Sequence, residues 1–175
     1  MVLGHCGLTN EGFVRKLRPM SDPKHVLFVC TGNTCRSPMA EGLLRKALEG
    51  RDDFKVGSAG VAASKGTSAS PETVAILKKK GAPLDGFKSR PVTEAILGQA
   101  SHVFAMTEGH LAVLEGRFPQ YADKFFLVRE FSGISDKRQG IDVPDPIGMG
   151  MPAYEEVAKV FESAIPSIIA YVDAT

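Results

Sequence analysis

One short segment combines a nucleophile with groups that bind an anion. Residues 30–38 read Cys-Thr-Gly-Asn-Thr-Cys-Arg-Ser-Pro, so that Cys30 precedes Arg36 by six positions, between an apolar run and a helical pattern. A strand would bring Cys30 to the end of a sheet, where Arg36 and the first amides of the next helix face its sulfur. Unpaired N–H groups and the helix dipole make such a place an anion site. The Gly-Lys string of nucleotide-binding P-loops is absent.

The residue types within the segment favour a curled phosphate-binding loop. Gly32 permits close approach of the backbone, and Asn33 tolerates a left-handed turn or, alternatively, is an exposed turn residue. Ser37 is predicted to cap the following helix, with Pro38 at its first position. The backbone amides predicted to bind phosphate are those of Thr31, Gly32, Asn33, Thr34, Cys35 and Arg36. The alternative is that Cys30 is a buried residue at a strand end and Arg36 an unrelated surface residue. The agreement of the glycine, asparagine, serine and proline positions would then be a coincidence.

This segment resembles the active-site loop of the low-molecular-weight protein tyrosine phosphatase family, most closely its bacterial protein-arginine-phosphatase branch. Four further strings follow in the family's order, within a resemblance that covers residue 24 to the C-terminus. They are Ser-Ala-Gly at 58–60, Ala-Ser-Pro at 69–71, His-Val-Phe-Ala-Met-Thr at 102–107 and Asp-Pro at 145–146. The resemblance implies a phosphatase that acts on phosphorylated proteins without a cofactor.

The chemistry expected of such a site needs a nucleophile, a clamp and an acid. Cys30 is the predicted nucleophile, since nearby amides and a guanidinium favour its thiolate, and Arg36 is the predicted fork for phosphate oxygens. Asp145 is the acid that the family's Asp-Pro pattern implies, and Asp142 is the competing carboxylate. Ser37, besides its capping role, is a candidate donor to the departing sulfur, and Asn33 is assigned to holding the loop in shape.

The remaining cysteines and histidines suggest redox control and no metal. The resemblance implies that Cys35 can form a reversible disulfide with Cys30, whereas the alternative is a small buried side chain. Cys6 is interpreted as incidental. His102 and His110 lack metal-ligand spacing and are assigned structural or surface roles.

Two positions bear on which phosphate is cleaved. Thr34 stands where tyrosine-directed members usually have Ile or Leu, and Thr marks the arginine-phosphatase branch. Ile147, after the Asp-Pro pair, stands where tyrosine-directed members usually have an aromatic residue and the arginine branch commonly has Phe. Phosphoarginine is therefore favoured over phosphotyrosine, with Thr34 as the main support.

Two other classes of function fit the sequence less well. Thiol arsenate reductases share this loop but need resolving cysteines downstream, and the chain has none after Cys35. A phosphate sensor or scaffold with an inactive site would be expected to lose the cysteine, the arginine or the aspartate, and all three are present.

Composition restricts the setting in which the protein works. A length of 175 residues with 43% hydrophobic content predicts one domain, and a net charge of +1 argues against a nucleic-acid surface. No apolar stretch is long enough for a membrane span, and three cysteines fit a reducing compartment, so a cytoplasmic protein is expected. Nothing in the sequence indicates the oligomeric state.

Apolar runs alternate with helical patterns along the chain, which predicts an α/β fold. Residues 1–23 are interpreted as a flexible extension and 24–175 as the phosphatase domain, a three-layer sandwich with helices on both faces of a four-stranded parallel sheet. The expected strands are 25–30, 54–59, 102–106 and 125–129. The expected helices are 37–49, 70–80, 93–99, 108–118 and a last one from 152, with an apolar stripe along 157–172 and a kink at Pro166.

Overall fold

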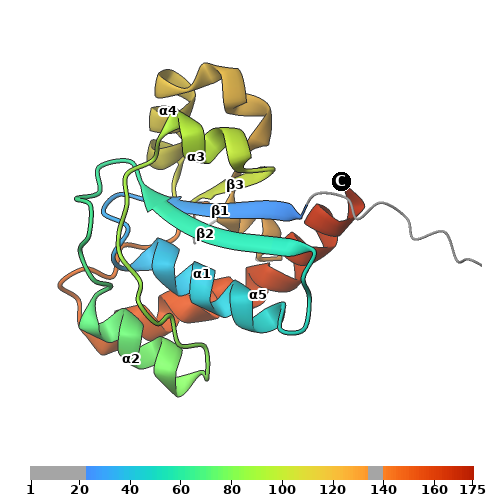
Figure 1. The fold of residues 1–175 in the computed structure, drawn as a ribbon. Coiled ribbons are helices and arrows are strands. Elements are labelled where there is room, and N and C mark those ends of the chain that lie inside the picture. Colours follow the sequence, from blue (N-terminus) through green and yellow to red (C-terminus); the bar gives the residue numbers. More distant parts are fainter. Residues whose placement is uncertain (1–22, 134–139) are drawn as a thin grey trace, which may run out of the picture.

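A parallel four-stranded sheet forms the centre of the computed structural model, which describes residues 23–133 and 140–175 (Figure 1). The strand order is β2-β1-β3-β4. The strands are β1 (Lys24–Cys30), β2 (Phe54–Gly60), β3 (His102–Ala105) and β4 (Phe125–Leu127). Val29 pairs with Ala59 on one side and Ala105 on the other, so the carboxyl ends of three strands lie together. Ligands of open parallel sheets bind at such an edge.

Helices cover both faces of the sheet. One face is covered by α1 (Arg36–Ala47), α2 (Pro71–Lys79) and α5 (Met151–Ala174), and the other by α3 (Glu94–Gln99), α4 (Glu108–Arg117) and the short helix η1 (Pro119–Lys124) (Figure 1). Alternate residues of β1 serve the two layers, because Val26 and Phe28 pack with α1 and α5 while Leu27 and Val29 pack with α3 and α4. The predicted α/β three-layer fold is confirmed.

The apolar stripe predicted along the last helix packs against the sheet. Its fully buried members are Val157, Phe161, Ala164, Ile165, Ile168 and Val172, and its partly buried members are Val160 and Ile169. The helix continues on both sides of Pro166. This packing fixes the start of α5 beside the carboxyl end of the sheet.

The structure corrects two local predictions. The chain leaves β4 at Leu127 and forms a 3-10 turn, η2 (Val128–Phe131), instead of extending to residue 129. Helix α1 begins at Arg36 with Cys35 as its N-cap and no side-chain capping bond, so Ser37 is not the cap. The Ser37 hydroxyl has other partners, described below.

No helix within residues 23–133 and 140–175 is long and apolar enough to cross a membrane. Cys6 and the proposed N-terminal extension, except Pro23, lie outside the described residues.

Candidate active site

A five-residue loop joins the end of β1 to the start of α1. Two backbone bonds tie it to the segment after β2, where Val61 N donates to Cys30 O at 2.9 Å and Ala62 N to Thr31 O at 3.0 Å. A Cβ on Gly60 would lie 2.4 Å from Thr31 O, so the close approach of the two segments requires glycine at position 60. The loop is therefore held against the neighbouring strand.

Asn33 is the fully buried centre of the loop. Its φ is 55°, in the left-handed region that asparagine tolerates. Its Nδ2 donates to Ser37 Oγ at 2.9 Å and to Ser58 Oγ at 2.8 Å, and its Oδ1 accepts from Arg90 N at 2.9 Å. The interpretation of Asn33 as an exposed turn residue does not match this position.

The Cys30 sulfur lies at the N-terminal end of α1. The thiol is buried and free, with Ser37 Oγ 3.0 Å and Asn33 N 3.3 Å from Sγ. A hydroxyl, a backbone amide and the positive end of a helix all favour negative charge on the sulfur. This arrangement suits a thiolate nucleophile.

Arg36 is almost completely buried and has one unsatisfied donor. Its Nη2 lies 2.7 Å from Asp145 Oδ2, and its Nη1 donates to Val143 O at 3.3 Å. Its Nε is buried and has no hydrogen-bond partner among the described residues. Because buried N–H groups are nearly always satisfied in folded proteins, this one is suited to an anionic ligand.

The two candidate acids have different surroundings. The side chain of Asp145 is 49% exposed, and its second oxygen accepts from Ile147 N at 3.2 Å. Asp142 Oδ1 instead accepts from Glu108 N at 2.8 Å, at the start of α4. Asp145 is therefore the carboxylate that pairs with Arg36, and Asp142 serves as a contact between its loop and α4.

Cys35, the last residue of the loop, is buried and contacts two hydroxyl groups. Its Sγ lies 3.3 Å from Tyr154 Oη and 3.6 Å from Thr34 Oγ1. Burial and the contact with Cys35 raise the pKa of Tyr154 to about 12, so the phenol keeps its proton at neutral pH. Sequence reasoning missed Tyr154, because an aromatic residue at a helix start carries no local sign of contact with the loop.

His110 joins the loop to α4. Its ring nitrogens lie 2.7 Å from Thr31 Oγ1 and 2.8 Å from Thr107 Oγ1. Burial, followed by the nearby Arg36 charge, lowers the pKa of His110 to about 4, so the ring is neutral at pH 7. The second histidine considered from the sequence, His102, lies at the start of β3, where Nε2 is 3.0 Å from Thr175 Oγ1. The described residues contain no group of three or more His, Cys, Asp or Glu side chains that could hold a metal ion.

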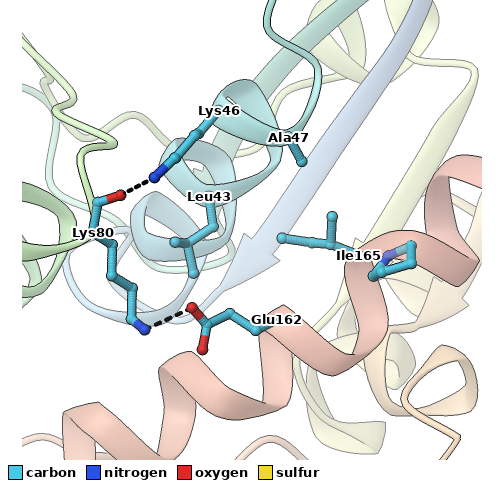
Figure 2. A pocket seen from close by; sticks show the side chains of 7 residues that line it. Leu43, Lys46, Ala47, Lys80, Glu162 and Ile165 are labelled. Carbon is cyan, nitrogen blue, oxygen red and sulfur yellow. Dashed lines mark hydrogen bonds and ion pairs between the residues drawn. The ribbon is translucent and has the colours of Figure 1, made fainter.

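A separate hollow of about 490 Å³ lies between α1, the end of α2 and α5 (Figure 2). Lys46 donates to the backbone carbonyl of Lys80, whose own ammonium pairs with Glu162 at 2.6 Å. The hollow is lined mainly by apolar groups, including Leu43 and Ile165, and no residue of the loop lines it. The cysteine, arginine and aspartate that suit chemistry are thus not part of this hollow.

Comparison with known proteins places these features in one family. Residues 25–175 match the family described as low molecular weight phosphotyrosine protein phosphatase. A protein-arginine-phosphatase of Geobacillus stearothermophilus is 40% identical over 144 residues, which cover 82% of this chain and 92% of that protein. The low molecular weight protein-tyrosine phosphatase A of Mycobacterium tuberculosis is 36% identical over 161 residues, or 88% and 94% of the two chains. A solved structure of the YwlE arginine phosphatase with a phosphorylated active-site serine, a Cys-to-Ser mutant, has a TM-score of 0.76 at 35% identity, covering 85% and 95%.

Proposed function

This chain belongs to the low molecular weight phosphotyrosine protein phosphatase family and is a cysteine-dependent protein phosphatase, and we propose that its preferred substrate is phosphoarginine in proteins. The observation that carries the catalytic assignment is the unsatisfied Nε of buried Arg36 in the loop that holds the free Cys30 thiol. A phosphoryl group supplies the oxygen acceptor that this nitrogen lacks, and it supplies the phosphorus that a thiolate attacks.

In the first step the Cys30 thiolate attacks phosphorus. A sulfur–phosphorus bond forms as the bond between phosphorus and the substrate nitrogen breaks. Arg36 and the amides of residues 31–36 bind the phosphoryl oxygens and so stabilise the negative charge on these oxygens in the transition state. The phosphoryl oxygens take the place of Asp145 at Arg36. Away from that positive charge the Asp145 carboxylate takes up a proton from water, and the resulting carboxylic acid passes it to the departing guanidine nitrogen.

In the second step water hydrolyses the cysteinyl-phosphate. The Asp145 carboxylate takes a proton from the water, the new oxygen–phosphorus bond forms, and the sulfur leaves as a thiolate. Ser37, whose Oγ lies 3.0 Å from that sulfur, stabilises the leaving thiolate by donating a hydrogen bond to it. The phosphorylated active-site serine of the YwlE mutant supports a covalent phosphoenzyme stage on this fold.

The choice of phosphoarginine depends on Thr34 and on relatives of that specificity. Among the described residues the one hydrogen-bond contact of the Thr34 hydroxyl is with Cys35 Sγ, at 3.6 Å, so the hydroxyl oxygen is available to accept from a guanidinium N–H. Ile147, 67% exposed next to Asp145, offers an apolar surface to either an arginine stem or a phenyl ring, and it discriminates little. The second candidate, phosphotyrosine, is favoured by the specificity of the mycobacterial relative.

Initial rates on matched phosphoarginine and phosphotyrosine peptides test this assignment. We expect kcat/KM to favour phosphoarginine, and Thr34→Ile to reduce phosphoarginine turnover about tenfold to hundredfold, since a hydrogen bond to a charged group contributes about 1.5–3 kcal/mol. Phosphotyrosine turnover on the same preparations is the control for general damage, and it should hold or rise. An unchanged ratio would exclude Thr34 as the selector. Appreciable activity in Cys30→Ser would instead exclude the thiolate mechanism itself.

A further inference from the structure

Behind the loop, a continuous chain of hydrogen bonds connects the catalytic sulfur to a buried carboxylate. Starting from Cys30 Sγ, the chain passes to Ser37 at 3.0 Å and on to Asn33 at 2.9 Å. Asn33 then donates to Ser58 at 2.8 Å, and Ser58 donates to Glu41 Oε2 at 2.6 Å. Every one of these residues is buried. Glu41 has no part in the mechanism described above, although it ends this chain.

The donors and acceptors along the chain can be ordered from the Glu41 end. An ionised carboxylate only accepts, so Ser58 gives Glu41 its single hydroxyl proton and can offer Asn33 only a lone pair. Asn33 therefore turns its NH₂ group toward Ser58, and the second proton of that group goes to Ser37. Ser37 accepts from Asn33 on one lone pair, and its single proton has two possible acceptors, the Cys30 sulfur at 3.0 Å and Ala59 O at 3.4 Å. The sulfur is the nearer of the two, and a thiolate can only accept, so the Ser37 hydroxyl directs its proton to Cys30.

We propose that Glu41 is a positioning residue for the phosphatase reaction, whose carboxylate fixes the direction of this chain so that Ser37 donates to the Cys30 thiolate. The inference rests on the proposed role of Cys30 as nucleophile. The backbone amide of Arg90, which donates to Asn33 Oδ1 at 2.9 Å, favours the same orientation of the asparagine amide. Two anchors thus orient Asn33, one through its oxygen and one through its nitrogen.

The charge of Glu41 depends on the groups that face it from three segments. Arg45, on its own helix, lies 2.5 Å from Oε1, and Arg90 adds a more distant positive charge beside β2. Asp85 and Lys88 complete the charged lining of the hollow of about 270 Å³ next to it. Burial raises the pKa of Glu41, and the Ser58 hydrogen bond and the two arginines oppose that rise. The Ser58 hydrogen bond is the largest of these opposing influences, so Glu41 keeps its main partner when Arg45 is removed.

The rate of alkylation of Cys30 by iodoacetamide, followed against pH, tests the proposal. Tandem mass spectrometry of the peptide 25–36 separates Cys30 from Cys35. In Glu41→Met, Ser58 is free to reverse its hydroxyl, and we expect the midpoint of the alkylation profile to rise by about one pH unit, which corresponds to about 1.4 kcal/mol. Ser58→Ala should shift it in the same direction, and the double variant should shift no further. Glu41→Gln, which keeps an acceptor for Ser58, should restore most of the parent profile.

Arg45→Met is the matched control, because it removes the exposed partner of Glu41 and leaves the chain of hydrogen bonds intact. Its midpoint should equal that of the parent protein, and a shift as large as that of Glu41→Met would overturn the proposal. Parent-like midpoints in folded Glu41→Met and Ser58→Ala would overturn it as well. If Glu41→Met does not fold, Ser58→Ala decides alone. Alkylation of Cys30 can be measured without turnover. Failure of the Glu41 proposal, read from the alkylation midpoints, is therefore distinguishable from failure of the proposed function, read from the activity of Cys30→Ser.

Discussion

Asp145 has two proposed effects that a single substitution separates. In the free site it occupies Arg36, with 2.7 Å between Oδ2 and Nη2, and during the reaction it transfers protons. Asp145→Asn keeps the size of the side chain and removes both the charge and the acid. We therefore expect turnover to fall while the affinity for inorganic phosphate rises.

The two magnitudes follow from different features of the site. Loss of a general acid lowers kcat by about 10²- to 10⁴-fold, and the loss should be largest for substrates with poor leaving groups. The Asp145 side chain is 49% exposed, so we treat its ion pair with Arg36 as a surface pair. Such pairs contribute about 0.2–1 kcal/mol, and release of Arg36 should tighten phosphate binding by about 1.4- to 5-fold. Removal of the negative charge acts in the same direction.

The assay measures kcat for a series of aryl phosphates together with competitive inhibition by inorganic phosphate. Asp142→Asn is the control, since an asparagine oxygen can still accept from Glu108 N, and both constants should stay near the parent values. A larger loss of kcat in Asp142→Asn would move the acid to that residue. Weaker phosphate binding in Asp145→Asn would refute the idea that Asp145 competes for Arg36.

Three further predictions concern the loop and its supports. Asn33→Gly should lower the free energy of unfolding by about 2–4 kcal/mol, because three hydrogen bonds are lost. Asn33→Ala should lower it by about 1–2 kcal/mol more, because the φ of 55° at this position is strained for alanine. Equal urea midpoints for the two variants would contradict this. His110 has a pKa of about 4 when folded and near 6.5 when unfolded, so the unfolded chain takes up the proton first, and stability should fall between about pH 6.5 and pH 4 and then level off. Urea unfolding of His110→Asn should show a weaker dependence over that range, and parallel curves would contradict the assignment. Peroxide should inactivate the enzyme and dithiothreitol restore it, with poorer recovery in Cys35→Ser; equal recovery would leave Cys35 with a packing role only.

The phosphate loop could be predicted from sequence because its determinants are consecutive residues. Asn33 allows a left-handed backbone conformation that few other residues adopt, and the flanking apolar run and helical pattern are local signals. Gly32 is not required in the same way, since a Cβ there would meet only Thr34 Oγ1 at 3.5 Å. Alternation of such patterns also sufficed for the parallel sheet. Asp145 is different, since Asp-Pro marks ordinary turns and only the family resemblance selected it.

Predictions failed where the partners of a side chain are set by the folded structure and not by a local rule. Ser37 has the residue type of a helix cap, but in the fold its hydroxyl has Cys30 and Asn33 as partners, and a local rule cannot weigh those against a capping bond. Tyr154 and Glu41 looked like ordinary residues of amphipathic helices. Their roles depend on how α5 and α1 pack against the loop and β2, which single-sequence periodicity does not specify.

The loop is supported by contacts from three other elements of the fold. Thr31 is held by His110 of α4, Asn33 by Ser58 of β2, and Cys35 by Tyr154 of α5. A loop whose amides face a ligand cannot satisfy its own buried polar groups, so these contacts from three elements preorganise it. Thr34 differs, because within residues 23–133 and 140–175 its hydroxyl makes no hydrogen bond outside the loop and contacts the sulfur of its neighbour Cys35. Substitutions at the supported positions should therefore reduce stability and turnover together, whereas substitution at Thr34, the proposed selector, should change substrate preference and leave these supports in place.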